Sequence, residues 1–169
     1  NIDMKKILVT YNMFKEGFQE LENKYQVTFP ANPMQNFTYD EIIELIPEYD
    51  ALCTMFNFTV TKELIDKAEN LQIIANYGVG YDNIDIAYAK EKEIIITNTP
   101  DPVINPTANL ALSLLLETAR RVSEYDRKLR TYEKNIKTNI LENLGMPVTG
   151  QTLGIIGMGR IGKALCKRA

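Results

Sequence analysis

The chain has 169 residues, and its 19 lysines and arginines against 22 aspartates and glutamates give a net charge of −3. Hydrophobic residues make up 45% and charged residues 24%, which is ordinary for a globular protein and excludes disordered and collagen-like chains. The slight acidity gives no electrostatic case for nucleic-acid binding, and no apolar run approaches the roughly 20 residues that cross a bilayer, so neither partner is expected.

The sequence contains no histidine, and this bounds its chemistry. A Ser-His-Asp triad, a histidine-ligated metal site and a histidine general base are excluded from these residues. Two cysteines, Cys53 and Cys166, are too few for a disulfide framework or a thiolate metal site, and they indicate a reducing, cytoplasmic compartment. We expect both to be small packing residues, and we expect no metal. Residues 1–3 precede a methionine, so we expect the native start at Met4.

Five short apolar runs alternate with amphipathic segments over residues 4–98. Each run is bounded by polar residues and has the length of a buried strand. Strands that alternate with helices predict an α/β domain with a parallel sheet and right-handed crossovers, and ligands bind such sheets at the carboxyl ends of the strands. The predicted strands are 7–9, 27–29, 51–53, 73–75 and 94–96.

Three helices are predicted between these strands. Thr38 has Glu41 three residues later, the spacing of a capping box, and Pro47 ends the helix that follows. Thr61 is the predicted N-cap of the next helix. An earlier helix is predicted from three apolar residues at helical spacing, Phe14, Phe18 and Leu21.

A proline-rich passage at 99–102 marks a crossing between two units. Asn105 and Pro106 are the predicted N-cap and first residue of a long helix that runs to about residue 130. The first part of this helix is apolar nearly all round, so we expect it to be covered in a core or between subunits. Its second part is heavily charged and is expected to face solvent.

Glycine is concentrated near the carboxyl end of the sequence. Gly157-x-Gly159-x-x-Gly162 follows a predicted strand at 153–156 and opens a helical segment, which is the setting of the dinucleotide-binding fingerprint. In that fingerprint the first glycine permits a tight turn, the second lets the backbone approach a pyrophosphate, and the third lets helix and strand pack closely. A plain strand-turn-helix with packing glycines is the alternative.

A second glycine cluster, Gly78-Val79-Gly80, follows the fourth predicted strand. Two glycines around one apolar residue can bare successive N–H groups and form an anion nest, which would suit a carboxylate. The alternative is an ordinary strand-to-helix turn with Asp82 or Asn83 as N-cap. The loop at 55–57, after the third strand, is a weaker candidate for the same rim.

In this order, these segments resemble the NAD-dependent D-2-hydroxyacid dehydrogenases. NYGVGYDNIDI at 76–86 is similar to the family's substrate loop, TNTPDPVINPTANLALSLLLETARRV at 97–122 to its crossover and long interdomain helix, and GQTLGIIGMGRIGKAL at 150–165 to its coenzyme fingerprint. The sequence of the helix is most similar to those of the glyoxylate/hydroxypyruvate reductases and phosphoglycerate dehydrogenases. Residues 4–72 match in pattern only.

The resemblance implies a flavodoxin-like substrate domain at 4–98 and, at 99–169, the interdomain helix and the start of a Rossmann coenzyme domain. It also implies a homodimer through the helix at 105–130, and hydride transfer between NAD, with NADP open, and a 2-oxo or D-2-hydroxy acid. In the family the catalytic arginine, glutamate and histidine follow the fingerprint, so no catalytic residue is assigned here and these residues alone are expected to be inactive. The substrate loop corresponds to Tyr77, Gly78, Val79 and Gly80, and the coenzyme site to Thr107, Gly157, Gly159, Arg160, Ile161 and Gly162.

Three departures from the family pattern leave the subfamily open. Asn109 stands where an acidic residue is common, Lys92-Glu93 replaces the usual glycine before the fifth strand, and Tyr132 stands where the family often has tryptophan. Two other functions stay open on the same resemblance. One is a nucleotide-sensing, corepressor-like binding protein, and the other is an inactive truncated product.

Overall fold

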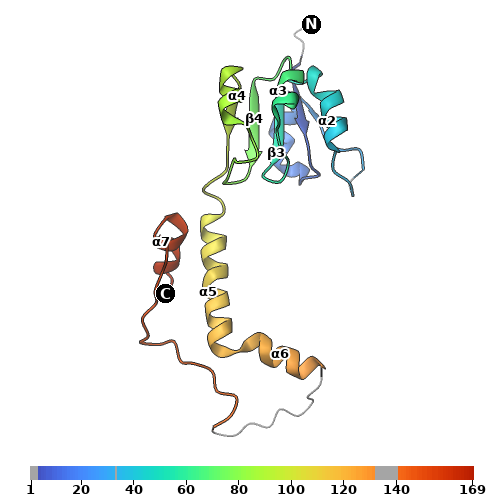
Figure 1. Cartoon of the computed structure of the whole chain (residues 1–169). Coiled ribbons are helices and arrows are strands. Elements are labelled where there is room, and N and C mark those ends of the chain that lie inside the picture. The colour runs from blue at the N-terminus through green and yellow to red at the C-terminus, as the bar shows by residue number, and fades with distance from the viewer. Residues whose placement is uncertain (1–3, 33, 132–140) are drawn as a thin grey trace. The chain divides into compact units, whose positions relative to one another are not determined.

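The computed structural model describes residues 4–32, 34–131 and 141–169. The predicted start at Met4 concerns residues 1–3, which lie outside the described residues. The chain divides into two compact units, Asn1–Asp101 and Pro102–Ala169 (Figure 1). No helix in the described part of the chain is long and apolar enough to cross a bilayer.

The first unit is built on a parallel sheet of five strands in the order β2-β1-β3-β4-β5. Each predicted apolar run forms one of these strands, and helices connect them, which confirms the predicted α/β class. An order of 2-1-3-4-5 is that of flavodoxin-like sheets. The strands are β1 (Lys6–Val9), β2 (Gln26–Thr28), β3 (Ala51–Met55), β4 (Ile73–Tyr77) and β5 (Ile95–Thr97).

The helices of this unit begin largely where local chemistry predicts. The capping box of Thr38 and Glu41 is formed at the start of α2, and the Thr61 side chain caps α3, so both predictions are confirmed. Asp85, rather than Asp82 or Asn83, caps α4, because its carboxylate accepts from the N–H of Tyr88. The helices are η1 (Lys15–Phe18), α1 (Gln19–Glu22), α2 (Tyr39–Leu45), η2 (Ile46–Glu48), α3 (Lys62–Lys67) and α4 (Ile86–Glu91).

One face of the sheet carries the hydrophobic core. Leu8, Leu52 and Ile74, from three neighbouring strands, are fully buried in one cluster with side chains of α2, η2, α3 and α4. These helices therefore cover one face of the strands (Figure 1). Burial of this apolar surface is the main term that holds the five strands together.

The opposite face of the sheet is more open. A groove of about 530 Å³ there is lined by half-buried strand residues, among them Ile7, Cys53, Ile73 and Ala75, and by side chains of η1, α1 and Tyr25. Burial raises the pKa of the Cys53 thiol to about 11, so this cysteine stays protonated at neutral pH and is a packing residue as predicted.

The second unit contains three helices in its described part: α5 (Ile104–Arg120), α6 (Val122–Thr131) and α7 (Arg160–Cys166). The predicted single helix over 105–130 is therefore wrong, because Arg121 adopts the left-handed conformation (φ 58°) and ends α5. The start differs as well: Val103 is the N-cap, and Pro106 is the third helical residue, where its missing N–H is tolerated.

The predicted strand at 153–156 does not form. This stretch has no regular structure, Leu153 is 38% exposed and Ile156 is fully exposed. A strand requires a neighbouring strand for its N–H and C=O groups, and the described part of this unit contains none. Cys166 is exposed, so the prediction that it packs in a core is wrong.

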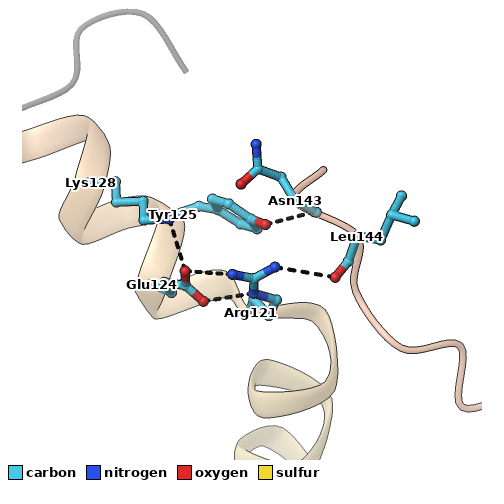
Figure 2. Close-up of polar contacts among 6 residues, drawn as sticks. All are labelled: Arg121, Glu124, Tyr125, Lys128, Asn143 and Leu144. Carbon is cyan, nitrogen blue, oxygen red and sulfur yellow. Dashed lines mark hydrogen bonds and ion pairs between the residues drawn. The ribbon is translucent and has the colours of Figure 1, made fainter. Parts of the chain in front are cut away.

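A polar contact joins the bend between α5 and α6 to the returning chain (Figure 2). The Arg121 guanidinium donates to both carboxylate oxygens of Glu124, at 2.7 and 2.6 Å, and to the carbonyl of Leu144 at 3.4 Å. The Tyr125 hydroxyl donates to the carbonyl of Asn143 at 2.6 Å. Hydrogen bonds from Arg121, and then from Lys128, lower the pKa of Glu124 to about 2. We call this set of residues the bend contact.

Candidate functional site

The loop after β4, residues 77–81, lies at the carboxyl edge of the sheet, where the sequence places its anion nest. Gly78 packs tightly there, because a Cβ at this position would lie 3.0 Å from the Cβ of Phe56. The loop that contains Phe56, at 55–57, therefore lies against the substrate-loop candidate, and the Phe56 side chain is exposed. The close approach explains why glycine is required at position 78.

The backbone N–H groups of this loop divide into two kinds. The N–H of Gly78 is used within the protein, since it donates to the Thr99 hydroxyl at 3.0 Å and lies 3.0 Å from the carbonyl of Asn76. The N–H groups of Val79, Gly80 and Tyr81 donate to no acceptor among the described residues. Three successive free donors make an anion-binding concavity feasible here.

The carbonyls of Gly78, Val79 and Gly80, in contrast, are each occupied. The carbonyl of Gly78 accepts from the N–H of Thr99 at 2.9 Å, that of Val79 from the Asn98 side chain at 2.8 Å, and that of Gly80 from the Asn76 side chain at 2.8 Å. We call these three interactions the carbonyl ties. They leave the loop with its acceptors satisfied and its donors open.

Two asparagine side chains hold the loop in place through hydrogen bonds. Asn76 is 2% exposed, and its side-chain oxygen accepts from Asn83 at 3.3 Å. The Asn83 amide also donates to the carbonyls of Met55 and Phe58, at 3.2 and 2.9 Å, so it joins the loops that follow β3 and β4. Each buried polar atom of these side chains has a partner, as burial requires.

Sequence reasoning missed the asparagines and threonine that hold this loop. Asn76 and Asn83 lie inside the segment that carried the resemblance, and Asn98 and Thr99 lie in the next one, yet none was assigned a role in holding the loop. The spacing of 19–21 residues between each tie from 98–99 and its carbonyl is invisible to local patterns. The β4–β5 pairing brings Ala75 opposite Thr97, and this register predicts the proximity once the sheet order is known.

The glycine fingerprint forms a tight turn that leads into α7, although the residues directly before it, 153–156, form no strand. Gly157 has a positive φ of 93°, which favours glycine. A Cβ on Gly162 would lie 2.3 Å from the carbonyl oxygen of Gly157, so close packing excludes any side chain there. A Cβ on Gly159 would meet nothing within 4 Å, so the fold leaves open space beside that backbone. A phosphate could occupy this space.

The other predicted coenzyme residues lie at the ends of α5 and α7. Thr107 is exposed in the first turn of α5. Arg160 and Ile161 are the first two residues of α7. The two helices are joined by Arg168, which donates to Asn109 at 2.6 Å and to Asn105 at 2.9 Å. Asn109, a departure from the family pattern, thus has a defined structural partner.

The first unit is thus a flavodoxin-like α/β unit with a glycine loop at the carboxyl edge of its sheet, and the second unit carries a glycine-rich turn before α7. The family model for the D-isomer specific 2-hydroxyacid dehydrogenase catalytic domain matches residues 7–157. The chain therefore belongs to the D-isomer specific 2-hydroxyacid dehydrogenase family.

Individual relatives agree with this assignment. The chain is 40% identical to a glyoxylate reductase of Pyrococcus horikoshii over 97% of its own length and 50% of the relative. Its structure is similar to that of the TT0316 protein from Thermus thermophilus (TM-score 0.86, 32% identity), covering 96% of this chain and 52% of that one. It is also similar to an NADPH-dependent glyoxylate/hydroxypyruvate reductase from Sinorhizobium meliloti in complex with NADP and malonate (TM-score 0.70, 27% identity), covering 98% and 50%. The chain spans about half the length of the relatives it matches.

Proposed function

We propose that the chain supplies the substrate loop and the coenzyme turn of an oxidoreductase that interconverts 2-oxo and D-2-hydroxy acids. The observation that carries this proposal is the set of free N–H groups at Val79, Gly80 and Tyr81 at the carboxyl edge of the sheet. Backbone donors of this kind bind a carboxylate, the group that all 2-oxo acids share. The Asp82 carboxylate lies 4.0 Å from the Cβ position of Gly80, so it opposes the bound charge and moderates the affinity.

The proposed cofactor is NAD, with NADP as the alternative. The turn from Gly157 to Gly162 fits a pyrophosphate, because its left-handed glycine shapes the turn and the space beside Gly159 is open. Arg160 and Ile161 belong to the same turn, and Thr107 is proposed to lie on the nicotinamide side. A bound nicotinamide cofactor would supply the hydride chemistry at C2 of the acid, and the loop at 77–81 would hold the carboxylate of that acid.

No catalytic acid, base or carbonyl-polarising group is assigned within these residues, and histidine is absent. We therefore expect residues 1–169 alone to show no NADH oxidation with any 2-oxo acid. Because the adenosine-binding part of the fingerprint is not among them, we expect NAD binding much weaker than micromolar by titration calorimetry. Measurable turnover, or micromolar NAD binding, by residues 1–169 alone would contradict this expectation.

The test of the proposal is an assay of the protein produced from its complete reading frame. Glyoxylate, hydroxypyruvate and pyruvate are each supplied with NADH and with NADPH, and absorbance at the nicotinamide band is followed. A Gly80→Ala variant should raise KM for the acid, since its methyl group enters the proposed carboxylate space. Gly17→Ala is the matched control, because Gly17 lies in η1, outside the loop, and a Cβ there meets nothing within 4 Å. No oxidation of either cofactor with any acid would overturn the proposal.

A further inference from the structure

The carbonyl ties have a geometric consequence for the loop donors. In a planar trans peptide the C=O and the next N–H point in opposite directions. No cis peptide bond occurs in the described chain. A donor that fixes the carbonyl of Val79 therefore also fixes the direction of the Gly80 N–H, and the ties on Gly78 and Gly80 act likewise on the N–H groups of Val79 and Tyr81.

The residues that donate the three carbonyl ties differ in whether they also support the fold. Asn76 is buried and bonded to Asn83, so it also supports the fold. Thr99 makes its tie through its backbone N–H. Asn98 is half-buried, directly follows β5, and its side chain makes one hydrogen bond in the described structure, to the carbonyl of Val79. Of the three donors, the Asn98 side chain is therefore the one whose described hydrogen bonding serves the loop alone.

We propose that Asn98 is a positioning residue, whose side-chain amide holds the Val79–Gly80 peptide so that the Gly80 N–H faces the substrate carboxylate. The inference rests on the proposed function in one respect, because it takes the loop at 77–81 as the site that binds the substrate carboxylate. The orienting role itself follows from the contact at 2.8 Å and from peptide geometry. Without the tie, this peptide is free to rotate and to present its carbonyl, which repels an anion.

The orienting role is tested on the 169-residue chain labelled with ¹⁵N. Asn98→Ala removes the side chain, and Asn98→Asp keeps its shape but replaces the donor by an acceptor. Asn70→Ala is the matched control, because the Asn70 amide holds the carbonyl of Pro47 at 2.7 Å before the start of β4, whereas the loop at 78–81 follows the end of that strand. We expect lower backbone order parameters at Val79 and Gly80 in both Asn98 variants only, with an unchanged midpoint of thermal unfolding. Unchanged order parameters in both would overturn the inference.

A titration with sodium glyoxylate separates this inference from the proposed function. In the wild type, the amide resonances of Val79 and Gly80 should shift and saturate. In both Asn98 variants the dissociation constant should rise roughly three- to tenfold, the effect of one hydrogen bond, while Asn70→Ala should leave it unchanged. A wild-type loop that does not respond would refute the carboxylate site, and the order parameters would still decide the role of Asn98. Equal affinities in wild type and Asn98→Ala would refute that role alone.

Discussion

Glu93 holds a backbone conformation that ordinarily belongs to glycine. Its φ is 59°, and it follows the C-terminus of α4 in a Schellman arrangement, in which its own N–H donates to Lys90 and that of Ile94 donates to Ala89, at 3.1 and 2.9 Å. This is the place where Lys92-Glu93 departs from the glycine of the family pattern. The backbone at Glu93 therefore has the left-handed conformation that glycine favours, although the residue is a glutamate.

We predict that Glu93→Gly stabilises the first unit. Removing the Cβ relieves the left-handed strain, which costs roughly 1 kcal/mol in a residue other than glycine. Glycine also raises the conformational entropy of the unfolded chain, and this offsets part of the gain in stability. Urea unfolding followed by far-ultraviolet circular dichroism measures the change. Glu91→Gly is the control, since position 91 is helical and glycine should destabilise it. A less stable Glu93→Gly protein would contradict the prediction.

The bend contact predicts an acid-sensitive residue. The pKa of Glu124 is lowered from 4.5 to about 2 by Arg121, and next by Lys128. Ionised Glu124 therefore stabilises the bend above the ordinary pKa, and this contribution is lost as the pH falls toward 2. A ¹³C NMR titration of the carboxylate should give a midpoint near 2, and Arg121→Ala should move it upward. Arg127→Ala removes a cation from the same helix outside the contact, and an equal upward shift there would refute the assignment to Arg121.

At the scale of elements, short apolar runs predicted all five strands of the sheet, because each run had neighbours in the same unit to pair with. The stretch at 153–156 has the same pattern and forms no strand, because pairing is a property of two segments rather than one. The bend at Arg121 was equally hidden, since arginine is an ordinary helix former and only the contact with Glu124 and Leu144 explains the turn.

In the candidate site, too, local sequence patterns predicted the turns but not the long-range contacts that hold them. Glycine spacing predicted turns at 78–80 and 157–162, and at Gly157 the positive φ of 93° is the physical reason for glycine. The carbonyl ties from Asn98 and Thr99 could not be predicted, because they join residues that only the strand order brings together. Asn98 is an ordinary polar residue until the register of β4 and β5 places it beside Val79.

The fingerprint turn separates glycines required by the fold from glycines that leave space. Gly162→Ala places a methyl group 2.3 Å from a carbonyl oxygen, so we expect α7 to shift at a cost of roughly 1–3 kcal/mol and its amides to exchange faster with deuterium. Gly159→Ala, with nothing within 4 Å, should leave exchange in α7 unchanged. Gly154→Ala is a second control, because its Cβ position is equally open. Equal exchange in all three variants would show that the close approach is relieved without cost.

At the scale of the whole molecule, the apolar surface of α5 supports the proposed homodimer. Leu110 and Leu114, one helical turn apart, are 58% and 52% exposed. Analytical ultracentrifugation should show a dimer that Leu110→Glu with Leu114→Glu converts to a monomer, because a buried unpaired carboxylate is costly. Phe14→Glu is the control, since Phe14 is 90% exposed outside this helix. A monomeric wild type, or a dimer that survives the double substitution, would refute the interface.

The strand order also bears on how the protein is made. Every strand of the sheet lies within residues 6–97, and the two pairings of the central strand, β1–β3 and β3–β4, are available before the second unit is synthesised. At the usual roughly 5–20 residues per second, the 72 residues from 98 to 169 take about 4–14 s to add. The sheet, with the carboxylate loop on its edge, thus has seconds in which to form on the ribosome, ahead of the coenzyme turn that it is proposed to serve.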